Sequence, residues 1–178
     1  MKEFKKIIPT EISDNFIKLI GADWMLVTAG DESECNTMTA SWGGVGYLWN
    51  KPVAIAYIRP QRHTFAFTER QERMTLSFFE EEHRPALAYC GTHSGKDEDK
   101  ILNAGLTTVF TKQGTPTFRE ARLVLECRKL YTDMLKEENF LQKDIIDNWY
   151  ANGDYHKVYV LEIENAYIKK RNERFGIY

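Results

Sequence analysis

The stretch NTMTASWGGVGYLWNKPVAIAYIRPQRHTF, residues 36–65, carries the strongest fold signal in the chain. Aliphatic and aromatic residues lie on both sides of the turn signal NKP at positions 50–52, and Pro60 closes the second run. Runs of this composition between turn residues are typical of β-strands. We therefore predict one strand over residues 38–49 and a second over residues 52–58.

The rest of the chain continues this β-rich pattern, with helices between the strands. It shows no strict βαβ alternation and no repeat, which disfavours a doubly wound parallel sheet. We predict a mainly β fold, an antiparallel barrel with helices on its outside. Ser13 is the expected cap of the first helix. Further strands are expected over residues 24–30, 74–79, 121–135 and 156–170, and helices over residues 14–22, 62–70, 83–90, 97–105 and 140–150.

Length and composition indicate one folded domain. The 178 residues are 43% hydrophobic and 13% aromatic, which is enough for a core, and no linker composition divides them. We therefore expect a single domain over residues 1–178. The polar end, residues 169–178, is either an arm on a partner subunit or a loose tail. The formal net charge of -2 gives no cationic field for a phosphate backbone, so no nucleic acid partner is expected.

The sequence shows no targeting segment and no membrane span. The first 15 residues turn polar after Ile8, and no apolar run approaches the roughly 18 residues of a membrane helix. Cys35, Cys90 and Cys127 form no CxxC pair and no metal-like spacing with the histidines. We expect a cytoplasmic protein with no membrane contact, no disulfide framework and no metal site.

The segment CGTHSGKDEDK, residues 90–100, superficially suggests a phosphate loop. Only three residues separate its glycines, and Asp97 follows Lys96 where a P-loop has Ser or Thr, so a nucleoside triphosphatase is excluded. A capping turn explains Ser94 and Asp97 without any ligand, whereas His93 is harder to explain in that way. The chain contains no nucleophile elbow, HExxH motif or evident carboxylate pair. Any chemistry would therefore depend on a cofactor.

Two further polar strips point to a ligand. Thr37, Thr39 and Ser41 alternate, so on a strand their hydroxyl groups share one face; that face either binds a ligand or is exposed to solvent. Pro60 biases Arg59 toward an extended backbone and presents Arg62 near the start of the next helix. Helix N–H groups and a guanidinium both favour a phosphate, and the alternative is a solvated arginine pair.

Together, these motifs resemble the flavin reductase-like, FMN-binding split-barrel family, especially its flavoredoxin-type branch. The matching segments are residues 36–52, 54–65, 75–79 and 90–100, in order and spacing. The resemblance implies a six-stranded antiparallel Greek-key split barrel with peripheral helices. It also implies a homodimer that binds FMN near the subunit interface.

The resemblance assigns a cofactor-binding role to residues in all three motifs. Lys100 is the foremost charged partner for FMN among them, and no catalytic residue is assigned. This chain reads Arg-Pro-Gln-Arg where much of the family has a Ser, so whether one arginine or both hold the phosphate stays open. The residues implied are Asn36, Thr37, Met38, Thr39, Ser41 and Trp42 along the flavin, Arg59, Gln61, Arg62 and Thr64 around the phosphate and ribityl chain, and Cys90, Gly91, His93, Ser94 and Lys100 in the third segment.

The resemblance implies an NAD(P)H-dependent FMN oxidoreductase, in which hydride passes from nicotinamide to flavin. A flavoredoxin-like carrier that exchanges electrons with a protein partner is the second interpretation, and a non-catalytic flavin-binding sensor is the third. All three use the same binding residues. The aromatic residues Trp42, Tyr47 and Trp49 are expected either in the barrel core or at a subunit interface.

Overall fold

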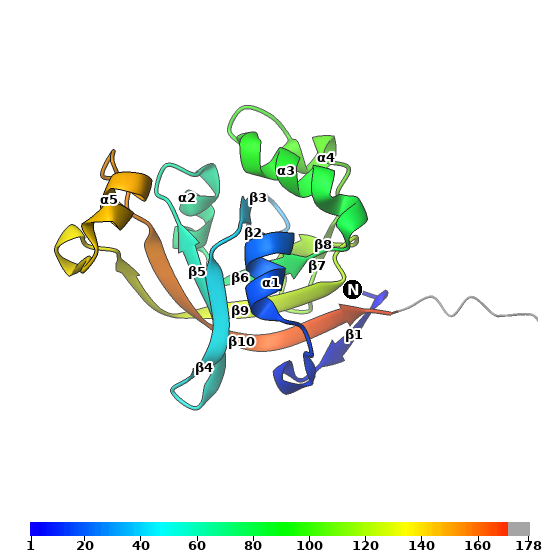
Figure 1. The fold of residues 1–178 in the computed structure, drawn as a ribbon. Helices are drawn as coiled ribbons and strands as arrows, with labels where there is room; N and C mark the ends of the chain where they lie inside the picture. Colours follow the sequence, from blue (N-terminus) through cyan, green and yellow to red (C-terminus); the bar gives the residue numbers. More distant parts are fainter. Residues whose placement is uncertain (171–178) are drawn as a thin grey trace, which may run out of the picture.

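The computed structural model describes residues 1–170. Its main sheet is antiparallel, with the strand order β3-β2-β6-β9-β10-β5-β4 and with β1 paired to β10 (Figure 1). This confirms the prediction of a mainly β fold; the main sheet has eight strands within these residues, where the resemblance implies six. The strands are β1 (Phe4–Ile7), β2 (Met25–Gly30), β3 (Cys35–Ala40), β4 (Gly43–Leu48), β5 (Lys51–Ile58), β6 (Arg73–Phe78), β9 (Leu123–Met134) and β10 (Lys157–Lys169), and β7 (Thr108–Phe110) pairs with β8 (Pro116–Phe118) in a separate hairpin.

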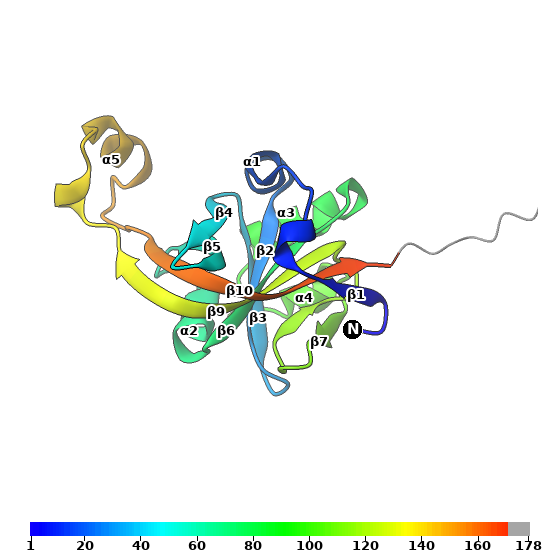
Figure 2. The same cartoon turned by 90° about the horizontal axis from the view of Figure 1, so that it is seen from below.

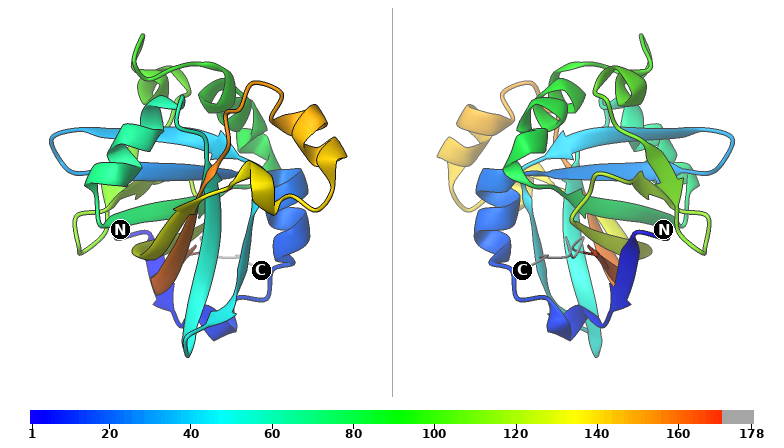
Figure 3. Two further views of the ribbon diagram at one scale, coloured as in Figure 1. Left: turned by 90° about the vertical axis from the view of Figure 1, so that its left-hand side faces the viewer. Right: turned by 90° about the vertical axis from the view of Figure 1, so that its right-hand side faces the viewer.

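The two edges of this sheet approach each other at one corner. The path of hydrogen-bonded strands begins at β3 and ends at β4, yet only Ser41 and Trp42 separate these two strands in the chain. The sheet must therefore curl until its edges nearly meet, which is the geometry of a split barrel, and Figure 3 shows the strands wrapped in this way. Buried side chains fill the inside of the curl, among them Val27, Leu76 and Leu125.

The predicted single strand over residues 38–49 is wrong, because it breaks at this corner. An added Cβ on Gly43 would lie 2.6 Å from the carbonyl oxygen of Ile55. Only a glycine lets the backbone approach β5 this closely, so the chain leaves β2 and pairs with β5 instead. Ser41 and Trp42 are thereby placed at the mouth of the barrel.

The helices lie outside the sheet, as predicted, with some boundaries shifted. The first helix is short and continues as a π-helical turn. Asn15 caps this helix, not Ser13 as predicted, because Oδ1 of Asn15 accepts hydrogen bonds from the backbone N–H groups of Ile17 and Lys18. The expected helix start at Asp97 is also wrong, because Asp99 caps that helix. The helices are α1 (Phe16–Lys18), the π turn Leu19–Asp23, α2 (His63–Arg70), α3 (Arg84–Thr92), α4 (Lys100–Asn103) and α5 (Lys143–Trp149), with 3-10 turns at Pro9–Glu11, Glu81–His83 and Glu137–Asn139.

Strands β9 and β10 extend beyond the barrel and carry α5 at their far end. Figure 2 shows this arm reaching away from the body of the molecule. Residues 135–156 between the two strands therefore form a separate wall beside the barrel mouth. In residues 1–170 no helix is long and apolar enough to cross a membrane. The predicted arm or tail at residues 169–178 falls almost wholly outside the described residues.

Candidate functional site

A cleft of about 270 Å³ opens at the corner between β3 and β4. One wall comes from the end of β3 and its link to β4, a second from the Pro60 corner, and a third from the α5 segment. The ring of Trp42 packs against Trp149 and His156, each with centroids 5.1 Å away. The cleft therefore combines aromatic walls with guanidinium groups. Its lining residues are Met38, Thr39, Ala40, Ser41, Trp42, Tyr57, Arg59, Arg62, Trp149 and His156.

Arg62 places a half-buried positive charge in this cleft. It is the residue before α2, and its Nη2 donates to the carbonyl oxygen of Gly91 at 3.0 Å. Within residues 1–170 no carboxylate forms an ion pair with it. Burial, and secondly the charge of Arg59, lowers the pKa of the Arg62 guanidinium, although arginine stays protonated in proteins. A bound anion would relieve this unfavourable electrostatic environment.

Arg59 lines the same cleft but is bound to the α5 segment. It forms an ion pair with Asp154, donates to the carbonyl oxygen of Trp149 at 2.8 Å, and lies 5.3 Å from the ring centroid of Tyr150. Gln61 also donates to Asp154, at 2.7 Å. The two predicted residues Arg59 and Gln61 thus hold the α5 wall against the barrel.

The hydroxyl strip on β3 is covered by the protein itself, which excludes the solvent-exposed alternative. Thr37 is fully buried and shares a 2.8 Å hydrogen bond with Thr28. Thr39 donates to the carbonyl oxygen of Leu87, the residue that anchors α3 on the strand. Of the three hydroxyl residues, only Thr39 and Ser41 also line the cleft. Most of this polar strip therefore serves the packing of α3 and β2 on β3.

The first and third motifs contact each other through small residues. An added Cβ on Gly95 would lie 2.2 Å from Oδ1 of Asn36, so a glycine is required there. Asn36 in turn donates to Oγ1 of Thr64 at 3.1 Å, and both side chains are buried. An added Cβ on Gly91 would lie 3.3 Å from Cβ of Thr39, which is a tight contact. The three predicted motifs are thus one packed unit in space.

Lys100 lies beneath this unit and not on its surface. Its side chain is buried, and Nζ donates to the carbonyl oxygens of Cys90 and His93 at 3.2 and 3.1 Å. Burial lowers the pKa of Lys100. An ammonium group has three donors, so one remains for another acceptor. Lys100 lines a different cleft, of about 800 Å³, together with Asn36.

The remaining residues of the third motif make local contacts. Burial raises the pKa of the Cys90 thiol to about 11, so the thiol stays protonated at neutral pH. His93 stacks on Tyr89 at 3.8 Å between centroids. The hydroxyl of Ser94 accepts from the backbone N–H of Lys96 at 3.2 Å, the turn contact expected without a ligand. In residues 1–170 no group of three His, Cys, Asp or Glu side chains could hold a metal.

Three aromatic side chains that line the cleft were not predicted as site residues from the sequence. Tyr57 was expected only as a strand residue, and Trp149 and His156 lie about 90 residues further along the chain than Arg59. Nδ1 of His156 and the hydroxyl of Tyr150 share a 2.8 Å hydrogen bond, and both residues are buried. No local pattern indicates these contacts, because they depend on how the arm folds back.

His156 makes the stability of the cleft depend on pH. Burial, and secondly the charge of Arg59, lowers its pKa from 6.5 to about 4. As the pH falls, the unfolded state takes up the proton before the folded state does. The contribution of neutral His156 to the free energy of unfolding is therefore complete above pH 6.5 and is lost as the pH falls toward 4. We expect the wild type to lose on the order of 2 to 3 kcal/mol more than His156→Gln between pH 7 and pH 4. Urea unfolding at both pH values measures the difference, and parallel losses would contradict it.

A curled antiparallel sheet whose mouth brings a half-buried guanidinium beside aromatic side chains is the architecture of a split-barrel protein. The chain belongs to the flavin reductase-like family, because the flavin reductase like domain matches residues 18–177. This match confirms the resemblance inferred from the motifs. No curated protein matched the sequence.

Solved structures confirm the predicted split-barrel fold. The FMN-binding domain of a flavin reductases-like enzyme from Shewanella baltica superposes with a TM-score of 0.67 at 15% identity, over 93% of this chain and 77% of that one. Flavoredoxin from Methanosarcina acetivorans gives 0.64 at 20% identity, over 83% and 69%. An NADH:FAD oxidoreductase from Streptomyces globisporus, in complex with NAD and FAD fragments, gives 0.59 at 19% identity, over 81% and 73%.

Proposed function

We propose that this protein is an FMN-binding NAD(P)H:flavin oxidoreductase, with its flavin in the cleft at the β3–β4 corner. The observation that carries the proposal is Arg62, a half-buried cation without a carboxylate partner in the described chain, beside aromatic walls. FMN has the matching chemistry: a planar ring, a polyol chain and a phosphate dianion. Membership of the flavin reductase-like family supports the same cofactor.

The residues of the cleft would divide the binding work. Arg62 would hold the phosphate through a charge-assisted hydrogen bond, with Lys100 adding positive potential, since the Arg62 charge lies close enough to help lower the pKa of Lys100. Arg59 is already paired with Asp154, so we assign it to the α5 wall and propose that one arginine holds the phosphate. The backbone at Thr39 and Ser41 would line the ring edge, and Trp42 would pack on the ring. The other predicted contacts, Asn36, Thr37, Met38, Gln61, Thr64, Cys90, Gly91, His93 and Ser94, would shape or support this site.

The bound flavin would accept hydride from nicotinamide and pass electrons onward. The chain would supply placement and exclusion of water, with His156 neutral at physiological pH as a hydrogen-bonding wall. The oxidoreductase from Streptomyces globisporus, in complex with NAD and FAD fragments, supports a nicotinamide nucleotide as donor. Likeness to the flavoredoxin from Methanosarcina acetivorans supports the second candidate, a carrier that serves a protein partner.

Anaerobic reduction separates these functions. We expect the flavin band of the FMN-loaded protein to bleach within seconds of adding NADH or NADPH. A bound flavin that ignores both nucleotides but is reduced by dithionite would reject the reductase and leave the carrier or the sensor. Free FMN at the same concentration is the control, since it reacts slowly with either nucleotide.

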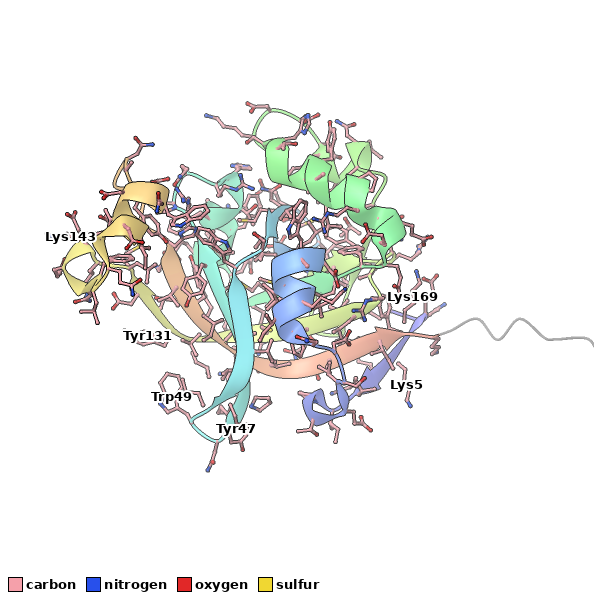
Figure 4. The ribbon with its side chains drawn as sticks, in the orientation of Figure 1. Lys5, Tyr47, Trp49, Tyr131, Lys143 and Lys169 are labelled. Carbon is pink, nitrogen blue, oxygen red and sulfur yellow. The ribbon has the colours of Figure 1, made fainter. Side chains whose placement is uncertain are left out.

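The site also suggests a homodimer. A volume of about 270 Å³ lies just below the usual range of ligand pockets, roughly 300–1,000 Å³, so these walls enclose only part of a mononucleotide. Tyr47, near the end of the edge strand β4, and Trp49, in the turn after it, are exposed, and Figure 4 shows both at the free end of the hairpin with β5. Exposed aromatic side chains of this kind are enriched at interfaces. We therefore propose that a second copy packs along β4, which runs from this exposed end to the corner where the cleft opens, and completes the cofactor site.

A cytoplasmic location fits the proposed reaction. Reduced nicotinamide nucleotides are cytoplasmic electron donors, and all three cysteines are free thiols in the structure. Free thiols are typical of a reducing compartment.

A further inference from the structure

A second cleft, of about 530 Å³, lies beside the first and has a different chemistry. It separates the π-helical turn after α1 from the α5 segment, two elements that flank the same part of the sheet in Figure 1. Ser41, Trp42 and Tyr57 line both clefts, so the two meet at these side chains. The other residues of the second cleft are Phe16, Ile17, Ile20, Gly21, Gly43, Leu135, Phe140, Ile145 and Tyr150.

No side chain that lines this second cleft is charged. Its polar side-chain groups are the indole N–H of Trp42 and the hydroxyl groups of Ser41, Tyr57 and Tyr150, and the hydroxyl of Tyr150 is engaged by His156. A nucleotide would bring phosphates into a wall without cations, which costs free energy because a charge leaves water without a partner. An uncharged ring gains from the same wall, because it buries apolar surface and stacks on aromatic side chains.

The cleft is open beside a glycine. Gly21 lines it, and an added Cβ there would meet no atom within 4 Å, so the space in front of Gly21 is open. Ile17, at the rim, leaves 89% of its surface exposed, and Trp42 leaves 38% exposed. The volume falls within the usual range for small-molecule sites, roughly 300–1,000 Å³.

We propose that this cleft binds a small, uncharged aromatic compound, one side chain away from the cofactor cleft. The two clefts meet at Trp42, so an occupant of the second cleft must end where the cofactor cleft begins. This limit favours a small molecule beside a cofactor over a segment of another protein. The second cleft shares only Ser41, Trp42 and Tyr57 with the cofactor cleft. The proposal therefore goes beyond the proposed function and does not require FMN.

Two fluorescent probes test the proposal. N-phenyl-1-naphthylamine is uncharged, and 8-anilino-1-naphthalenesulfonate carries the same type of ring system with a sulfonate. We expect the neutral probe to bind the wild type with saturation at one per chain and to bind at least tenfold more tightly than the sulfonate. Equal affinity for both probes, or no saturable binding of the neutral one, would overturn the proposal.

Variants locate the probe. Gly21→Phe should fill the open space and weaken binding of the neutral probe at least tenfold, whereas Leu141→Phe, in the arm that forms the opposite wall but 98% exposed and outside the cleft, should leave it unchanged. If Gly21→Phe lowers the thermal midpoint, Ile145→Gln provides the same comparison from the opposite wall. FMN binding measured on each variant distinguishes failure here from failure of the proposed function. Unchanged probe affinity in both cleft variants would refute the site.

Discussion

Arg62→Ala is expected to weaken FMN binding between about tenfold and a hundredfold. The substitution removes a charge-assisted contact to the phosphate, worth roughly 1.5 to 3 kcal/mol, and leaves an aromatic cleft that still accepts the ring. The residue is half-buried and contacts only the Gly91 carbonyl among hydrogen-bond acceptors in the described chain, so little else depends on it. Quenching of FMN fluorescence measures the affinity.

Riboflavin makes this test specific for the phosphate. It has the same ring and ribityl chain without the phosphate, so Arg62→Ala should leave its affinity within about twofold of wild type. Arg70→Ala is the matched control, because Arg70 lies at the other end of α2 with an exposed side chain paired to Glu34. Equal loss for FMN and riboflavin would mean that Arg62 acts on the ring or on folding.

Glu126→Ala is expected to lower the free energy of unfolding by at least about 3 kcal/mol. The Glu126 side chain is fully buried in β9 and accepts hydrogen bonds from Thr111, Thr115, Asn165 and Tyr167. Its removal leaves several buried donors without a partner, each costing about 1 to 3 kcal/mol, although part of that is recovered by relaxation. Urea unfolding with linear extrapolation measures the change.

An exposed glutamate provides the comparison. Glu72→Ala removes a side chain that is 60% exposed and paired with Arg73, and such surface pairs contribute about 0 to 1 kcal/mol. A loss for Glu126→Ala no larger than the loss for Glu72→Ala would contradict the role of Glu126. That role is to fasten the loop between β7 and β8 to the centre of the main sheet.

Local patterns predicted most of the fold because most strands are rich in β-branched and aromatic residues and lie between turn residues. The segments of β2, β5, β6, β9 and β10 are all recognisable in this way, since composition and turn residues are properties of short stretches. The break at Ser41 and Trp42 was not predictable, because both sides of it have strand composition. It depends on the close approach of Gly43 to Ile55, a contact that exists only in three dimensions.

The candidate site was predictable only where its residues lie close together in the sequence. Trp42 and Arg62 stand in one stretch of sequence, and the structure brings them to one cleft. Trp149 and His156 come from the arm, which the ion pair between Arg59 and Asp154 holds in place. Charges that pair across such a separation leave no pattern in a single sequence. The buried Glu126 was likewise hidden, because it looks like any polar residue on a strand.

Equilibrium dialysis against FMN tests most directly whether the cleft at the β3–β4 corner is a flavin site. We expect one FMN bound per chain for the wild type, and for Arg62→Ala the same limit reached only at FMN concentrations at least tenfold higher. The visible band of the bound flavin should shift, because Trp42 and His156 replace water around the ring. No FMN retained above the level of an unrelated protein would contradict the site and the function proposed for it.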